Sequence, residues 1–182
     1  MHRGEQNLLN DFNLLLSSPR GRERETCSEI WALFNELGDV AFKVDRTNVI
    51  GLVVAKTRLN PFEAVEKLRA ILAERPEAFH YTLKVTPIER VVPTDLNAIK
   101  NAVGELSTKI GKDEKFRVTV EKRHSELPTI DIVEAAASVI DRKVDLEHPD
   151  KIVLVEVLGK LTGISVIKPS DILAIAKERM SF

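Results

Sequence analysis

The sequence has very little cysteine, since Cys27 is its only one. A single cysteine cannot form an internal disulfide and leaves too few soft ligands for a zinc finger. No apolar run approaches the ~20 residues that a membrane-spanning helix needs, and the polar residues 1–11 lack the apolar stretch of a signal peptide. We therefore expect a cytoplasmic protein.

The sequence also lacks an excess of positive charge. It contains 27 Lys and Arg against 28 Asp and Glu, which gives a formal net charge of -1, whereas a chain whose whole surface binds nucleic acid has a pI above ~9. Any RNA-binding surface must therefore come from local clusters of cations. The hydrophobic fraction of 43% and the charged fraction of 30% are typical of folded soluble proteins, so we expect ordered structure nearly throughout.

Signatures of cofactor, metal and nucleophile chemistry are absent as well. The sequence has no Gly-x-Gly-x-x-Gly after a strand, no Walker-type phosphate loop and no His-Glu-x-x-His motif. Its histidines, His2, His80, His124 and His148, are dispersed without metal-ligand spacing. Adjacency of Ser125 to His124 does not by itself make a nucleophile and a base. We expect no cofactor, no metal and no catalytic residue.

Three apolar runs and one extended segment predict strands in the first half of the chain. The runs cover residues 12–17, 40–44 and 49–54, and the last two suit a hairpin. Residues 81–92 form one extended stretch in which Pro87 marks a bulge or an edge position.

Two amphipathic helices alternate with these strands. The first begins near Glu23 and ends before Gly38; its apolar face contains Cys27, Ile30, Trp31, Phe34 and Leu37. The second has Asn60 as N-cap and Pro61 at its first position. Strand, helix, strand, strand, helix, strand is the order of a ferredoxin-like split βαβ unit, which we assign to about residues 12–92.

The second half reads as helix, strand, helix and hairpin. Thr94 is the expected cap of one helix, residues 115–121 alternate as a half-buried strand, and Thr129 is the expected cap of the next helix. The β-branched runs 152–157 and 163–167 flank a short turn and predict a hairpin.

A loop rich in arginine joins the first strand to the first helix. Arg20, Arg22 and Arg24 lie in or beside it, and guanidinium groups next to the backbone N–H groups of a helix N-terminus suit a phosphate. The alternative is a solvated loop whose arginines pair with the glutamates of the following helix.

A second candidate site lies at the end of the strand 115–121. Arg123 could bind a phosphate with two donors, and His124 could contact a sugar or a base, with Lys122 beside them. In the alternative interpretation Lys122 and Arg123 are exposed turn residues and His124 forms a local hydrogen bond.

Isolated lysines near the predicted hairpin form the third candidate. Lys143, Lys151, Lys160 and Lys168 act as ligands only if the fold gathers them on one side, because lysine is ordinarily a surface residue. Lys160 lies in the hairpin turn and Lys168 at a strand end, so we expect them to be gathered.

Several blocks of the second half, taken together, resemble the THUMP domain. They are Phe116–His124, Lys143–Pro149 (KVDLEHP), Val153–Glu156 and Ser165–Lys168. The set is similar to the THUMP-domain adaptors that act with an acetyltransferase to make acetylcytidine in tRNA. Arg20–Glu23 and Pro87–Val91 look like the ferredoxin-like region that precedes the THUMP domain in that family.

The resemblance implies an α/β (α+β) protein in which a ferredoxin-like module, residues 1–92, is docked on a THUMP RNA-binding domain, residues 93–182. It further implies a tRNA-binding adaptor without a small-molecule substrate of its own, whose partners are tRNA and a separate tRNA cytidine acetyltransferase. The THUMP enzymes of known activity carry an additional catalytic domain, and the motifs of S-adenosylmethionine or ATP binding are missing here.

The expected RNA contacts are Arg20, Arg22, Arg24, Arg90, Lys122, Arg123, His124, Lys143, Lys160 and Lys168. Replacing Arg123 with Ala is expected to weaken all tRNAs about equally and to lower the salt slope of binding by about 1. Two alternatives remain open: a small tRNA-modifying enzyme with a site around His124 and Ser125, and a protein-interaction module that does not bind RNA.

Overall fold

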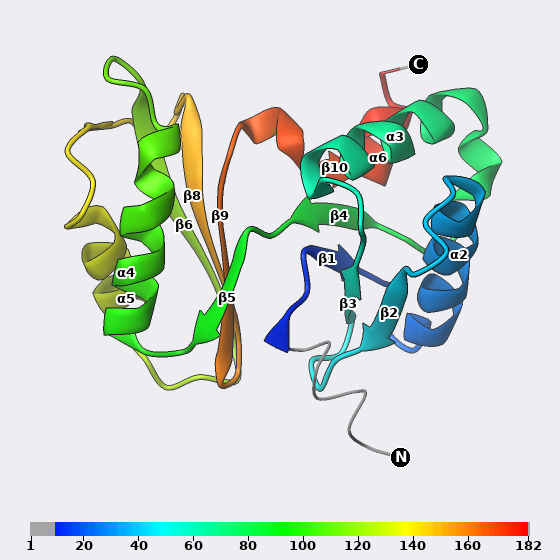
Figure 1. The fold of residues 1–182 in the computed structure, drawn as a ribbon, viewed down its shortest axis with the longest axis horizontal. Helices are drawn as coiled ribbons and strands as arrows, with labels where there is room; N and C mark the ends of the chain where they lie inside the picture. Colours follow the sequence, from blue (N-terminus) through cyan, green and yellow to red (C-terminus); the bar gives the residue numbers. More distant parts are fainter. Residues whose placement is uncertain (1–9, 182) are drawn as a thin grey trace. The chain divides into compact units, whose positions relative to one another are not determined.

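The structure, a computed structural model, describes residues 10–181. They form two compact units: unit 1 contains residues 10–88 and 171–181, and unit 2 contains residues 89–170 (Figure 1). The chain therefore builds most of unit 1, continues through the whole of unit 2, and returns to unit 1 at its carboxyl end.

Unit 1 contains an antiparallel sheet with the strand order β10-β4-β1-β3-β2. Its elements are β1 (Leu14–Ser17), α2 (Glu23–Glu36), β2 (Lys43–Arg46), β3 (Leu52–Lys56), α3 (Pro61–Glu74), the 3-10 turn η1 (Pro76–Ala78), β4 (Lys84–Pro87), β10 (Leu173–Ala174) and α6 (Ile175–Arg179). From β1 to β4, strands and helices follow the predicted ferredoxin-like order, and β1 lies between β3 and β4. That prediction is confirmed.

The two long helices of unit 1 start as their sequences predict, but α2 presents a different face. Asn60 caps α3, its Oδ1 accepting from the backbone N–H of Phe62 at 2.9 Å. In α2 the buried apolar side chains are Ile30, Leu33 and Phe34. Trp31, predicted to lie on the apolar face, is instead 51% exposed.

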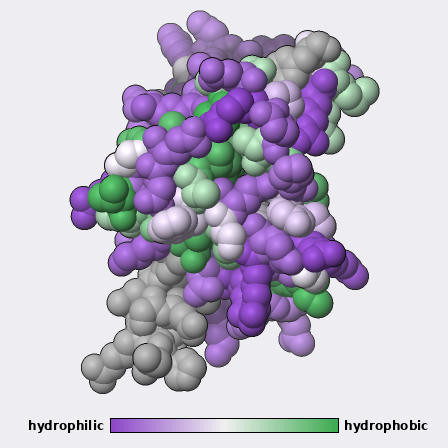
Figure 2. All heavy atoms as spheres, turned by 90° about the vertical axis from the view of Figure 1, so that its right-hand side faces the viewer, coloured by the Kyte–Doolittle hydropathy of each residue, from purple (hydrophilic) through white to green (hydrophobic). Residues whose placement is uncertain are grey.

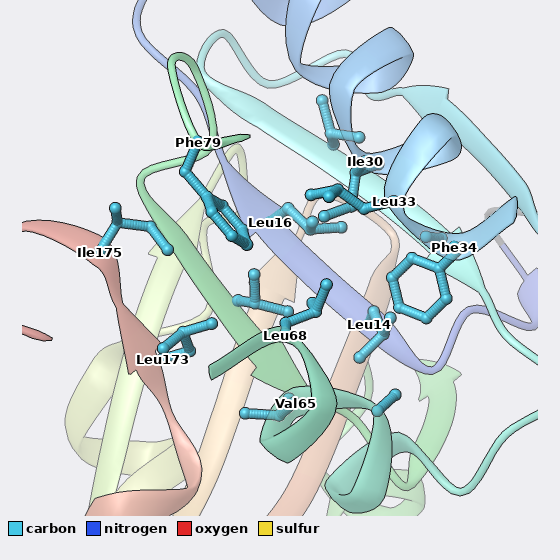
Figure 3. Packing of buried hydrophobic residues seen from close by; sticks show 14 of the residues in the cluster. Leu14, Leu16, Ile30, Leu33, Phe34, Val65, Leu68, Phe79, Leu173 and Ile175 are labelled. Carbon is cyan, nitrogen blue, oxygen red and sulfur yellow. The ribbon is translucent and has the colours of Figure 1, made fainter. Parts of the chain in front are cut away.

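The core of unit 1 lies between the sheet and its helices. Leu14 and Leu16 of β1, Phe34 of α2 and Leu68 of α3 are fully buried and belong to one cluster (Figure 3). Each such side chain contributes about 1.5–3 kcal/mol of hydrophobic free energy. Apolar residues of the strands thus supply one side of the core, and the apolar stripes of the helices supply the other.

The last residues of the described chain complete unit 1. Leu173 pairs with Val85 of β4 and, like Ile175, is buried in the core (Figure 3). An ion pair between Arg69 of α3 and Glu178 of α6 fastens the segment further. The predicted division into residues 1–92 and 93–182 assigned this segment to the second module, because its apolar residues do not reveal in the sequence which core they enter.

The predicted extended segment 81–92 is two strands that belong to different sheets. The backbone N–H of Ile88 donates to Asn13 O at 2.9 Å in unit 1, whereas the next N–H, of Glu89, donates to Ile164 O at 3.0 Å in unit 2. The strand β5 (Arg90–Pro93) consequently pairs with β9 and not with β1. Successive residues of a strand point their hydrogen-bonding groups to opposite sides, which makes such a change of sheet possible.

Unit 2 contains a mixed sheet with the strand order β5-β9-β8-β6-β7, in which β6 runs parallel to both its neighbours. After β5 its elements are α4 (Leu96–Leu106), the 3-10 turn η2 (Ser107–Lys109), β6 (Lys115–Arg123), α5 (Thr129–Ala137), β7 (Lys143–Val144), β8 (Lys151–Leu158), β9 (Leu161–Ile167) and the 3-10 turn η3 (Pro169–Asp171), which leads back to unit 1.

The helices α4 and α5 lie side by side on one face of this sheet (Figure 1). Ile99 of α4 and Ile132 of α5 pack with Val155 of β8 in one buried cluster. The hairpin prediction is confirmed, since β8 and β9 are joined by Gly159 and Lys160.

The caps of α4 and α5 differ from the predicted ones. Asp95, not Thr94, caps α4, its Oδ2 accepting from the backbone N–H of Ala98 at 2.9 Å. Thr129 is the first residue of α5, whose N-cap is Pro128 and which has no side-chain cap. Within the described residues, no helix is long and apolar enough to cross a membrane.

If the carboxyl-terminal segment completes unit 1, then Leu173→Ala should lower the free energy of unfolding of that unit. We expect a loss of about 2–5 kcal/mol from the lost contacts and the cavity. Urea unfolding followed by the fluorescence of Trp31, which lies in unit 1, measures it. Met180→Ala is the matched control because Met180 is 87% exposed; equal stability of the two variants would contradict this assignment.

Candidate nucleic-acid interface

Three of the predicted RNA contacts lie together at one end of the sheet in unit 2. The backbone N–H of Gly159 donates to Arg123 O at 2.9 Å, which brings the turn after β8 against the end of β6. Lys122, His124 and Lys160 are all exposed there. We call these three residues the strand-end surface.

His124 has an unusual backbone conformation in this surface. Its φ of 55° is the only positive φ of a non-glycine residue in the described chain. Gly159, with φ 63°, lies so close that a side chain there would begin 4.0 Å from the Cβ of His124. The left-handed conformation turns the chain sharply at the end of β6 and leaves the imidazole in solvent.

Both helices of unit 2 begin beside the strand-end surface. Lys122 Nζ donates to Leu127 O at 2.8 Å, just before α5, and the N–H of Thr94 donates to Lys160 O at 2.8 Å, just before α4. The amino ends of α-helices carry partial positive charge. The amino end of α4 is already capped by the carboxylate of Asp95, whereas that of α5 has no side-chain cap, so α5 is the helix whose amino end adds to the field of Lys122.

Arg123 is not a solvent-exposed ligand, contrary to the prediction. Its guanidinium forms an ion pair with Glu156 of β8, whose side chain is only 3% exposed. Alternation along β6 sends Arg123 to the face of the sheet opposite to Lys122. The sequence shows the alternation, but it does not show that a buried carboxylate lies in the neighbouring strand.

Lys160 and Lys168 are not gathered on one side, so that expectation was wrong. Lys160 precedes the first residue of β9, and Lys168 follows its last. At ~3.3 Å per residue they lie roughly 26 Å apart along the strand.

The remaining predicted residues of unit 2 also lie away from the strand-end surface. Lys143 pairs with Lys115, at the amino end of β6. Arg90 begins β5, and its Nε lies 3.6 Å from Glu105 Oε2 near the carboxyl end of α4. Neither contributes to the cluster around His124.

In unit 1 the arginine loop joins the end of β1 to the start of α2, as predicted. Arg22 pairs with Glu25, Nη1 to Oε1 at 3.0 Å. Arg20 and Arg24 are exposed and have no hydrogen-bond or ion-pair partner among residues 10–181. Of the three loop arginines, only Arg22 therefore pairs with a glutamate of the following helix, as the alternative interpretation expected for all of them.

Glu23 fixes the shape of this loop. Its Oε1 accepts from the backbone N–H groups of Gly51 at 2.9 Å and Gly21 at 3.3 Å. Hydrogen bonds from its own backbone N–H and from that of Gly51 hold the pKa of the Glu23 carboxyl below its ordinary value. The Glu23 carboxylate therefore holds the loop against the turn at Gly51 and remains ionised.

The block Lys143–Pro149, which carried much of the resemblance, forms a tightly fixed turn. Asp145 Oδ1 accepts from the backbone N–H of His148 at 2.9 Å and of Glu147 at 3.1 Å. These two bonds lower the pKa of the Asp145 carboxyl. Arg117 Nη1 donates to Leu146 O at 2.9 Å. The motif is explained by turn geometry, without a ligand.

Ser125, which belongs to the alternative enzyme site, and Cys27 of α2 have local surroundings that the structure defines. Ser125 Oγ accepts from the backbone N–H of Leu127 at 3.3 Å and so shapes the loop after β6. Burial raises the pKa of the Cys27 thiol to about 11, which keeps it protonated. In the part of the chain that the structure describes, no group of His, Cys, Asp and Glu could hold a metal ion.

The fold and this interface define a class of protein, an α+β chain in which an antiparallel N-terminal module accompanies a mixed-sheet domain. Residues 93–167 match the family model of the THUMP domain. Unit 2 is therefore a THUMP domain, as the sequence blocks predicted.

Solved structures share the fold of most of the chain at low sequence identity. PH1313 from Pyrococcus horikoshii is 17% identical with a TM-score of 0.61, and 87% of this chain and 55% of that one are covered. TrmN from Thermus thermophilus is 15% identical with a TM-score of 0.56, and the match covers 84% of this chain and 44% of TrmN.

A third similar structure is a 4-thiouridine synthetase–RNA complex with bound ATP, 18% identical with a TM-score of 0.52 and coverages of 90% and 42%. This chain thus spans about half the length of the solved proteins that it resembles. A comparison with curated protein sequences finds no match.

The ion pair between Arg123 and Glu156 leads to a stability prediction. Arg123→Ala should lower the free energy of unfolding by about 1–3 kcal/mol, less than for a fully buried pair because Arg123 is 23% exposed. Urea unfolding followed by circular dichroism measures the loss. Adding Glu156→Gln should recover part of it, and Lys122→Ala should cost little. Equal stability of Arg123→Ala and Lys122→Ala would contradict the structural role.

Proposed function

We propose that this protein is a tRNA-binding adaptor that presents a cytidine of tRNA to a separate acetyltransferase. The observation that carries the proposal is the THUMP domain with exposed cations and the amino end of α5 gathered at one end of its sheet. The THUMP domain suggests tRNA binding for tRNA modification. Acetylation comes from the resemblance of the sequence blocks to acetylation adaptors.

The contacts with RNA would be made to its phosphates. Lys122 and Lys160 are exposed point charges, and His124 can reach a sugar or a base. In unit 1, Arg20 and Arg24 are the exposed guanidinium groups. A likeness in fold supports RNA as the ligand, since one of the similar structures is a complex with RNA.

The adaptor role distinguishes this proposal from that of a self-sufficient enzyme. In the adaptor scheme the chain binds and orients tRNA, while another polypeptide supplies acetyl transfer. No residue of this chain is then needed as a nucleophile or a base, and the contact of Ser125 with the backbone of Leu127 is compatible with that scheme.

Binding through phosphate contacts should depend steeply on salt and on the strand-end lysines. Lys160→Ala should weaken binding of every tRNA by a similar factor and lower the slope of log K against log salt by about 0.9. Fluorescence anisotropy with labelled tRNA at several salt concentrations measures both. Lys143→Ala, at the other end of β6, is the matched control and should change the slope less.

Binding that is indifferent to salt would contradict the phosphate contacts. A larger effect of Lys143→Ala than of Lys160→Ala would instead place the RNA at the opposite end of the sheet. A loss confined to one tRNA would point to base readout in place of phosphate contacts.

Reconstitution separates the adaptor from an enzyme. The purified protein, incubated with tRNA and acetyl-CoA, ATP or S-adenosylmethionine, should produce no modified nucleoside alone, and addition of a tRNA cytidine acetyltransferase should yield acetylcytidine. Mass spectrometry of digested tRNA reads out the product. Turnover by the protein alone would overturn the adaptor role.

A further inference from the structure

Trp31, the only tryptophan of the chain, lies on α2 and is 51% exposed. The described chain contains stacked or tilted ring pairs at Phe34–Phe42 and His80–Tyr81, and Trp31 belongs to neither. A half-exposed tryptophan retains much apolar area that a ligand can still cover, and tryptophan is enriched at contact surfaces. The ring of Trp31 is therefore available to a ligand.

Trp31 continues a line of exposed residues that starts at the arginine loop. Arg24, Ser28 and Trp31 are all exposed and follow one another at helical spacing along α2. Seven residues of helix place Trp31 about 10 Å along the axis from Arg24. Figure 2 shows the face of unit 1 that carries α2; it is mainly hydrophilic, with hydrophobic side chains in small separate groups.

Each glutamate carboxylate of α2 accepts a hydrogen bond or forms an ion pair within unit 1. Glu23 accepts from the backbone N–H of Gly51, and Glu29 accepts from the backbone N–H groups of His80, Tyr81 and Thr82. Glu25 forms an ion pair with Arg22, and Glu36 forms one with Arg75. Arg20 and Arg24, by contrast, have no partner among the described residues. These two arginines are therefore the charged side chains of this loop and helix that remain exposed without a partner among the described residues.

From this juxtaposition we propose that Trp31 stacks on an unpaired base of the bound tRNA, while Arg24 and Arg20 contact the adjoining phosphates. The inference rests on the proposed function, since it names the part of tRNA that unit 1 recognises. An aromatic ring next to unpaired guanidinium groups is the combination that binds single-stranded nucleic acid. Exposed guanidinium groups without a partner can each give a phosphate two donors, which favours RNA as the occupant.

The single tryptophan makes the stacking directly observable. Titration of the protein with total cellular tRNA at low salt should quench the fluorescence of Trp31, with the same midpoint as binding measured by gel shift. A blunt-ended RNA duplex, which offers no unpaired base, should bind without comparable quenching. Trp31→Ala should weaken tRNA binding about 5- to 150-fold, the effect of one base stacked on an aromatic ring.

Two control variants separate stacking from other effects. Trp31→Phe should retain most of the affinity, because a smaller ring still stacks. Val40→Ala should bind like the wild type, since Val40 is an exposed apolar residue (83% exposed) outside the line on α2. The salt slope of Trp31→Ala should equal that of the wild type, because no cation has been removed.

The outcomes also separate this inference from the proposed function. Normal tRNA binding by Trp31→Ala, with no quenching in the wild type, would overturn the stacking and leave the tRNA adaptor intact. Absence of tRNA binding by the wild type would overturn both. If Trp31→Ala bound tRNA normally but no longer supported acetylation by the partner enzyme, the face would be a protein-docking surface and the stacking would be wrong.

Discussion

The parallel pairing of β6 with β8 is the constraint on which the candidate site depends. Parallel neighbours need a crossover, and here the chain between them contains α5, which must begin where β6 ends. The same register places Arg123 on the face that holds Glu156 and Lys122 on the opposite face. This strand pairing thus lets Arg123 form an ion pair within the sheet and leaves Lys122 exposed to a ligand.

The local patterns of the sequence were sufficient for most elements of the fold. The Asn60-Pro61 start of α3, the alternation of β6 and the hairpin at Gly159 each follow from interactions within a few residues. Pairings between segments distant in the sequence could not be predicted from these local patterns. The change of sheet after Ile88 and the return of Leu173 to unit 1 depend on which of the two cores accepts a short apolar segment. The segment itself suits either core.

The candidate site was predicted in part for the same reason. Lys122, His124 and Lys160 come together because a predictable strand end meets a predictable turn. The role of Arg123 depends on Glu156, a residue distant in sequence, and the exposure of Trp31 depends on how α2 is rotated against its sheet. Helical spacing gives the width of an apolar stripe, but it does not give which edge of the stripe remains in solvent.

In the proposed function, affinity for tRNA has two sources: phosphate contacts from exposed cations and, in unit 1, one aromatic ring. The most direct test of its central claim is an NMR titration of the labelled protein with tRNA at low salt. The account predicts that amide signals of residues 122–124 and 159–161 and of the arginine loop shift together as tRNA is added. Shifts confined to the turn at Asp145 and the amino end of β6, with the strand-end signals unchanged, would contradict it.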